Sequence, residues 1–205
     1  MGTVAVLFAR RDSIYKTLPG CDVWDIERDA RRWPGGCPVV AHPPCRAWGR
    51  LRHFAKPRPD EKDLAPWAVE QVRRYGGVLE HPSYSSLWPA MWLPNPGSGM
   101  DEFGGWTLPI LQWWWGHRAD KPTWLYIVGC QPSEIPDIPL RSGLAECVVV
   151  RPRRRKDGTR LRKGMAGWRP EITKAEREHT PPDLARWLVE LASRCAAPIR
   201  GSSVG

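Results

Sequence analysis

The sequence lacks any uninterrupted hydrophobic run long enough to cross a membrane, so we expect no membrane association. It also lacks a recognisable secretory signal, which favours a cytoplasmic protein. Its six cysteines include no Cys-x-x-Cys pair, and their spacing therefore indicates neither a zinc site nor a disulfide framework. We accordingly expect no metal cofactor and a reducing compartment.

Glycine is missing at the place where a nucleotide-binding chain most needs it. The apolar run at residues 3–9 has the length of a first strand, but residues 10–13 include two arginines and no glycine, and the next glycine is Gly20. A glycine-rich loop after the first strand lets phosphates approach the backbone closely. The sequence therefore does not predict such a loop here.

Negative charge is scarce, with 22 Asp and Glu against 31 Lys and Arg and a formal net charge of +9. This balance favours a polyanionic partner such as nucleic acid. The basic residues are densest at 151–163, around a hairpin turn signal at Asp157-Gly158. We expect a basic β-ribbon there that grips DNA phosphates, although a solvated basic segment is the alternative. Its DNA-binding candidates are Arg153, Arg154, Arg155, Arg160 and Arg162.

Alternating strand-like and helical patterns predict an α/β fold, and 205 residues are enough to bury one substantial core. We expect a catalytic α/β core at 1–129, a small basic DNA-recognition insert at 130–170, and a C-terminal helix at 171–205 that returns to the core. The expected strands are 3–9, 20–27, 38–41, 77–82, 123–129 and 146–150, and the expected helices are 28–33, 59–76 and one capped by Thr180.

Residues 39–52 are the stretch around which the chain is organised. A short β-branched run leads to Pro43 and Pro44, which a strand interior does not accommodate, so Cys45 is expected in a loop at the carboxyl end of a strand. Open α/β sheets bind ligands at that edge, and a thiolate there is a candidate nucleophile. The alternative is a small buried apolar cysteine. Three guanidiniums that favour the thiolate and can contact DNA belong to Arg46, Arg50 and Arg52.

Acidic residues end two other expected strands. Glu80 lies at the tip of the strand 77–82 and is a candidate general acid, unless it is a surface residue that merely ends the strand. Asp25 ends the strand 20–27, where an acidic side chain commonly binds ribose, although a solvated helix start explains it equally well. The proline-, glycine- and tryptophan-rich segment 85–107 is expected to form a long loop, which is typical of functional or mobile regions.

Five motifs in order over residues 20–190 resemble those of the DNA cytosine-5 methyltransferases. None is specific alone, but their order is hard to obtain by chance. The matches are Pro43-Pro44-Cys45 to the nucleophile loop, Glu80-His81-Pro82 to the acid motif, Asp25, Ala30 and Trp33 to the ribose segment, residues 115–129 to the Tyr-Gly…Gln-x-Arg block, and residues 177–181 to the Arg-x-Leu-Thr-Pro helix start.

This resemblance implies a Rossmann-like methyltransferase sheet flanked by helices, with the basic β-ribbon as the recognition insert. It implies that Cys45 attacks C6 of cytosine, that Glu80 protonates or hydrogen-bonds N3, and that a cation from Arg118 or Lys121 holds O2. Because these atoms are inaccessible in a stacked duplex, the base must be flipped out of double-stranded DNA. The chain is similar to compact phage-type relatives, which implies a monomer in the cytoplasm of a bacterial host.

The departures from the family concern the methyl donor. Where the family has Phe-x-Gly-x-Gly, this chain has Phe8 followed by Arg10 and Arg11, and the final Gly-Asn-x-x-Pro motif is missing. An arginine-lined pocket suits an anion, so we favour 5,10-methylenetetrahydrofolate as the donor and 5-hydroxymethylcytosine as the product. An S-adenosylmethionine-dependent methyltransferase and an inactive DNA-binding module are the alternatives. The donor-site candidates are Phe8, Arg10, Arg11, Trp24 and Asp25.

Overall fold

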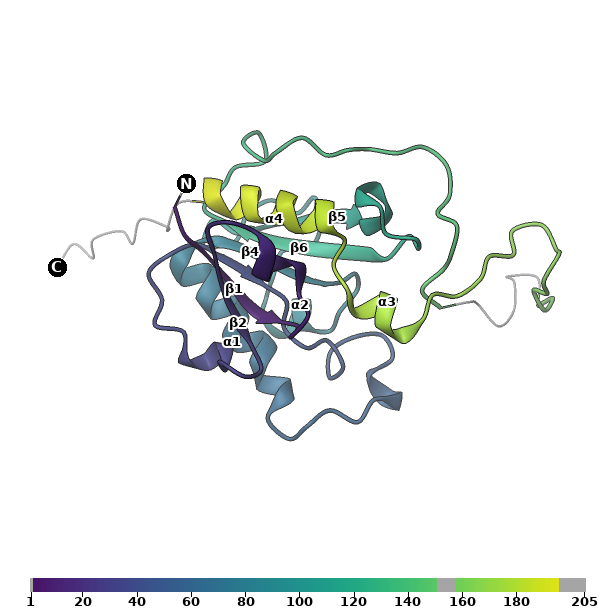
Figure 1. The fold of residues 1–205 in the computed structure, drawn as a ribbon, viewed down its shortest axis with the longest axis horizontal. Coiled ribbons are helices and arrows are strands. Elements are labelled where there is room, and N and C mark those ends of the chain that lie inside the picture. Colours follow the sequence, from purple (N-terminus) through teal and green to yellow (C-terminus); the bar gives the residue numbers. More distant parts are fainter. Residues whose placement is uncertain (1, 151–157, 196–205) are drawn as a thin grey trace.

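The computed structural model describes residues 2–150 and 158–195 and contains a six-stranded mixed sheet flanked by a few helices (Figure 1). The strand order is β2-β1-β3-β4-β6-β5. The first four of these are mutually parallel, whereas β6 runs antiparallel to both of its neighbours. The strands are β1 (Val4–Ala9), β2 (Cys21–Asp25), β3 (Val39–Ala41), β4 (Gly77–Pro82), β5 (Trp106–Leu111) and β6 (Pro122–Val128).

The helices are few and mostly short. The two long ones are α1 (Glu61–Tyr75) and α4 (Pro182–Arg194), and single α-helical turns form α2 (Leu87–Ala90) and α3 (Lys174–Glu178). Short 3₁₀ segments are η1 (Ile14–Thr17), η2 (Ala30–Arg32), η3 (Arg52–Phe54) and η4 (Gln112–Trp115).

The two long helices cover opposite faces of the sheet. Side chains alternate between the faces along each strand, so neighbouring strand positions enter different cores. Val40 and Val78 pack in the core that contains the apolar face of α4, whereas Ala41 and Leu79 pack in the core that contains α1. Side chains that continue the Val40 and Val78 positions beyond the strand ends are therefore expected on the α4 side.

The strand order fixes where a ligand is expected. From β1 the chain passes to β2 on one side and then crosses to β3 on the other, so the order reverses beside β1. In open α/β sheets, ligands bind outside the carboxyl ends of the strands at such a point. Here the loops that follow β1 and β3 are the segments at that position.

The α/β class and most expected elements are confirmed. The segments 3–9, 20–27, 38–41, 77–82 and 123–129 contain β1, β2, β3, β4 and β6, and 59–76 contains α1. Gly76 ends α1 with φ 76°, a left-handed conformation that glycine adopts without strain. The long loop at 85–107 is interrupted only by α2 before β5 begins.

Four local expectations are wrong. Residues 28–33 form only η2, because Asp29 has φ 53° and Pro34 follows. Residues 146–150 form no strand, since Cys147 and Val148 make only isolated bridges. The edge strand β5 begins inside the segment 85–107 that was expected to be a loop, and it contains Pro109, which an edge strand tolerates. The N-cap of α4 is Pro181, not Thr180, and no side chain caps it.

The basic ribbon is only partly within the described residues. Arg153, Arg154, Arg155 and Asp157 lie outside them, so the expected hairpin stays a prediction. The described remainder, residues 158–163, contains no strand.

Candidate active site at the carboxyl ends of β3 and β4

Cys45 begins a tight turn directly after β3. Its carbonyl oxygen accepts hydrogen bonds from the backbone N–H groups of Trp48 at 3.0 Å and Gly49 at 2.7 Å. The Trp48 carbonyl in turn accepts from the Ser86 N–H at 3.0 Å and from the Ser85 and Ser86 hydroxyls at 3.3 and 3.0 Å. These bonds fasten the turn to the loop after β4 and leave the Cys45 side chain exposed to solvent.

Glu80 is the centre of a hydrogen-bonded chain across the strand ends. Its Oε2 lies 3.1 Å from His42 Nδ1, and its Oε1 accepts from Gln112 Nε2 at 2.9 Å. His42 Nε2 lies 2.9 Å from the Tyr15 hydroxyl, and Gln112 Nε2 also donates to the Thr123 hydroxyl at 3.0 Å. Because an ionised carboxylate only accepts, His42 Nδ1 is the donor to Glu80.

Charge at the site keeps Glu80 ionised. Burial raises the pKa of Glu80, but the hydrogen bond from His42 and the nearby charge of Lys121 outweigh burial and lower it to about 2. Burial also lowers the pKa of Lys121, and the charges of Glu80 and Cys45 oppose that shift. Lys121 has φ 40° and its Nζ donates to the His179 carbonyl at 3.2 Å. A partly buried cation and a partly buried carboxylate thus act on the thiol.

The expectation that three arginines favour the Cys45 thiolate is wrong. Although the residue is exposed, the protein packed around its sulfur partly desolvates the thiol and raises the pKa of Cys45. The charge of Glu80 raises this pKa further, and only Lys121 among the main influences is a cation that lowers it. Arg46 is instead ion-paired with the fully buried Glu61. Arg50 and Arg52 are exposed and are not among the main influences on the pKa of this thiol, whereas Lys121 is the main cation that lowers it.

Arg118 faces a different partner. Its Nη1 donates to Glu176 Oε1 at 2.7 Å, its Nε lies 3.7 Å from Glu146 Oε2, and its side chain is exposed. Of the two cations expected to hold the pyrimidine oxygen, the structure brings only Lys121 to Glu80 and Cys45.

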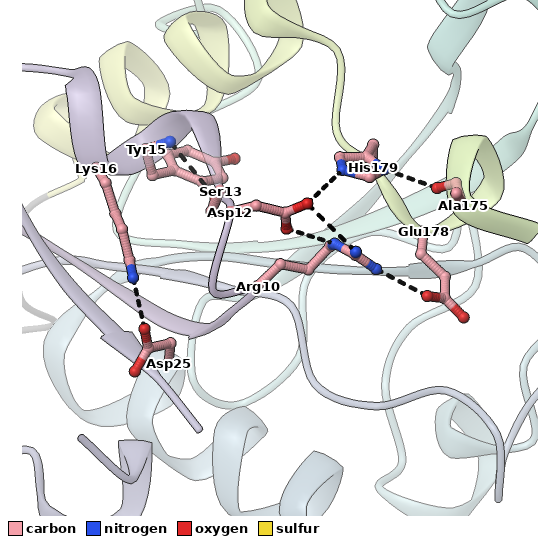
Figure 2. Close-up of polar contacts among 9 residues, drawn as sticks. All are labelled: Arg10, Asp12, Ser13, Tyr15, Lys16, Asp25, Ala175, Glu178 and His179. Carbon is pink, nitrogen blue, oxygen red and sulfur yellow. Dashed lines mark hydrogen bonds and ion pairs between the residues drawn. The ribbon is translucent and has the colours of Figure 1, made fainter. Parts of the chain in front are cut away.

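Both arginines of the expected donor site are already paired, and Figure 2 shows the partners of Arg10. Arg10 extends from the loop after β1 and donates to Asp12 Oδ1 at 2.9 Å and to Glu178 Oε2 at 2.7 Å. Arg11 Nε lies 3.2 Å from Glu27 Oε1, and both side chains are largely exposed. An anion that binds these guanidiniums has to compete with the carboxylates already there.

The other donor-site candidates are also engaged. Asp25 is almost fully buried and accepts from Lys16 Nζ at 2.7 Å (Figure 2). Both residues, together with Arg28, line a hollow in the surface. The Arg28 guanidinium covers the Trp24 ring at 3.8 Å. Phe8 has φ 62°, at a register irregularity in β1. Asp25 is therefore already paired with Lys16, and the Trp24 ring is already covered by Arg28, so neither is free to bind a donor.

A basic loop follows the Cys45 turn. Within the described residues, Arg50, Arg52 and Lys56 are exposed and make no ion pair, and Phe54 among them is 87% exposed. Arg160 and Arg162 are exposed as well, on the segment beyond the undescribed residues.

Sequence reasoning missed four residues of the site. Tyr15, His42, Gln112 and His179 bond directly to Glu80, to Lys121 or to a residue that does. Only His42 carried a signal, because it continues the alternation of Val40 toward the α4 side.

No protein-family model, curated protein or solved structure matches this chain. The resemblance to cytosine-5 methyltransferases therefore rests on the short sequence motifs alone. In the described part of the chain, no three His, Cys, Asp or Glu side chains are grouped so that they could hold a metal ion. None of the helices described is both long and apolar enough to span a bilayer.

Proposed function

We propose that this protein is a DNA cytosine C5 one-carbon transferase that acts on a flipped cytosine through Cys45. The observation that carries the proposal is the meeting of Cys45, Glu80 and Lys121 at the carboxyl ends of β3 and β4 and the start of β6. A thiol, a carboxylate and an ammonium in one place are the groups that activation of a pyrimidine ring requires.

In the proposed reaction the Cys45 thiolate adds to C6 of cytosine, which makes C5 nucleophilic. Negative charge develops on the N3 side of the ring, and the ring accepts a proton at N3. Glu80 is ionised, so it stabilises the protonated N3 as a hydrogen-bond acceptor rather than by delivering its own proton. That proton comes from solvent, and His42 Nδ1, 3.1 Å from Glu80, holds the carboxylate in place as its hydrogen-bond donor.

Lys121 has two roles in this scheme. Its ammonium opposes the rise in the pKa of Cys45 and so favours the nucleophile. Its charge also suits the O2 atom of a cytosine placed between Cys45 and Glu80. When the reaction at C5 is complete, loss of the C5 proton and departure of the Cys45 sulfur from C6 restore the aromatic ring and the free enzyme.

Double-stranded DNA is the proposed partner, held by the basic loop that follows the Cys45 turn. Arg50, Arg52 and Lys56 follow the nucleophile closely in sequence and form no ion pair with another residue that the structure describes, and phosphate contacts of this kind position a protein on DNA. Phe54 is suited to stack against a base step opened by flipping, as apolar side chains do in other DNA complexes. The run at 151–163 extends the same positive charge.

We propose 5,10-methylenetetrahydrofolate as the donor, with 5-hydroxymethylcytosine as the product. The support is the sequence after Phe8, which has arginines in place of glycines. The fit is incomplete, because Arg10 and Arg11 are ion-paired and Trp24 is covered by Arg28. Methylenetetrahydrofolate would supply a one-carbon unit at the formaldehyde level and leave as tetrahydrofolate, with water supplying the hydroxyl oxygen. S-adenosylmethionine would instead supply a methyl group and leave as S-adenosylhomocysteine.

One observation favours the second candidate, an S-adenosylmethionine-dependent methyltransferase. Asp25 is a buried carboxylate at the carboxyl end of β2, the position from which acidic residues bind ribose in related sheets. Its hydrogen bonds to Lys16 and to the backbone would hold it in place for that role.

The decisive experiment is mass analysis of nucleosides from cytosine-containing DNA incubated with the protein and each donor separately. Formation of 5-hydroxymethylcytosine with methylenetetrahydrofolate alone supports the favoured donor, and 5-methylcytosine with S-adenosylmethionine alone supports the second candidate. The Cys45→Ala variant should form neither product and should still bind DNA. Product formation by that variant near the wild-type rate would refute covalent catalysis by Cys45.

A further inference from the structure

The segment between α3 and α4 contacts both sides of the candidate site. The His179 carbonyl accepts from Lys121 Nζ at 3.2 Å, and its ring Nε2 lies 3.1 Å from Asp12 Oδ2 in the loop after β1 (Figure 2). Arg10 connects the same two segments by its bonds to Asp12 and Glu178. One residue therefore holds the catalytic cation with its backbone and the donor-side loop with its side chain.

The His179 ring is surrounded by acceptors at both nitrogens. Nδ1 lies 2.7 Å from the Ala175 carbonyl, and Nε2 faces the Asp12 carboxylate. Neither oxygen can donate a proton, so both contacts are hydrogen bonds only when both ring nitrogens carry protons, that is, when the ring is an imidazolium. The charged groups around this ring are Asp12 and Arg10 after β1, Glu178 and its partner Lys174 from α3, and Lys121 before β6.

The ion pairs and hydrogen bonds between the loop after β1 and the residues at the end of α3 are weak enough to break and re-form. The side chains of Arg10, Asp12, Glu178 and His179 are 37%, 58%, 48% and 44% exposed, and exposed ion pairs hold only weakly. Loss of one ring proton would place a lone pair against either the carbonyl or the carboxylate, which breaks one of the two contacts. Lys121 itself has φ 40°, a strained conformation that persists only while its surroundings enforce it.

We propose that His179 is a positioning residue whose ring, held by Asp12 and the Ala175 carbonyl, keeps the Lys121 ammonium beside Glu80 and Cys45. The contact between the loop after β1 and the α3–α4 segment thereby couples the donor side of the site to the activity of the nucleophile. When the contact opens, Lys121 withdraws and Cys45 loses the cation that favours its thiolate. This inference deepens the proposed function and rests on it for the catalytic meaning of Lys121.

The test is the pH dependence of Cys45 alkylation by iodoacetamide in the free protein, followed at the Cys45 peptide by mass spectrometry. The Asp12→Asn variant should move the alkylation profile to higher pH and slow the reaction at neutral pH by about two- to tenfold. Removing a negative charge would by itself favour the thiolate, so a shift in this direction requires that Lys121 has moved. His179→Ala should shift the alkylation profile in the same direction. The variant that combines Asp12→Asn with His179→Ala should shift the profile little further than either single change.

Two controls make the outcome decisive. Asp183→Asn removes the carboxylate of an equally exposed ion pair, Asp183–Arg186 on α4, and should leave the profile unchanged. Lys121→Gln should move the Cys45 alkylation profile to higher pH by at least as much as Asp12→Asn, because it removes the cation itself. A wild-type profile in Asp12→Asn beside a shifted profile in Lys121→Gln would overturn the coupling and leave the proposed function intact. An unshifted profile in Lys121→Gln would overturn this inference and the proposed catalytic cluster together.

Discussion

Replacing Glu80 by Gln tests the electrostatics of the site through stability, without any substrate. The carboxylate accepts from His42 and Gln112 and faces the charge of Lys121, and its side chain is only 15% exposed. Gln has nearly the same shape but cannot carry the negative charge that these groups stabilise. The folded state should therefore lose free energy relative to the unfolded state at neutral pH.

The size of that loss follows from the pKa of Glu80. A fall from the ordinary 4.5 to about 2 corresponds to about 3 kcal/mol of stability, at about 1.4 kcal/mol for each pH unit. Because the folded-state pKa is lowered, this contribution is fully present above pH 4.5 and is lost as the pH falls toward 2. The difference between wild type and Glu80→Gln should thus be about 2–4 kcal/mol at pH 7 and should shrink below pH 4.5.

Urea denaturation at pH 7 and pH 3.5, followed by tryptophan fluorescence, measures this difference. Glu190→Gln is the matched control, because Glu190 is an exposed helical glutamate paired with Arg194 and should contribute less than about 1 kcal/mol. A difference between wild type and Glu80→Gln that does not change with pH, or that is no larger than the control, would refute the reasoning.

Two further predictions concern the sheet and the DNA contact. Gly77→Ala should destabilise the protein by more than about 3 kcal/mol, measured by urea denaturation, because its φ is 118° and a Cβ would lie 2.0 Å from the Val39 carbonyl oxygen. A Gly97→Ala variant, with open space around its Cβ, should cost much less, and equal losses would contradict this account. Neutralising residues 153–155 should reduce the slope of log K against log salt by roughly one unit for each lost phosphate contact, as measured by fluorescence anisotropy. An unchanged slope would show that this run does not contact DNA.

Much of the fold follows from local patterns. The spacing of Leu64, Ala68 and Val72 identifies α1, and Gly76 ends it because glycine adopts a left-handed conformation easily. The short apolar runs identify β1, β4 and β6 because runs of that length and composition are typical of buried strands. Local patterns fail at β5, where Pro109 argues against a strand until pairing with β6 places it at a sheet edge. They also fail at 146–150, where β-branched residues lack a neighbouring strand.

The candidate site divides in a similar way. Residue type and position after a strand were enough to select Cys45 and Glu80 and to place both at one edge of the sheet. They could not show that Arg46 pairs with Glu61 or that Arg118 pairs with Glu176, since those partners are distant in sequence. The direction expected for the pKa of Cys45 was wrong, chiefly because the surrounding protein shields the thiol from water and Glu80 lies nearby, and a linear pattern of residues shows neither.

The sequence by itself thus determined the α/β class, the main strands and helices, and the placement of two candidate side chains at strand ends, because these depend on periodicity, proline and glycine over short distances. Only the tertiary structure decided which charges meet. It brought Lys121 to Cys45 and Glu80, placed Tyr15 and Gln112 in the same hydrogen-bonded chain, and joined the loop after β1 to His179. Electrostatic interaction depends on distance in space and on burial, and a linear pattern of residues contains neither.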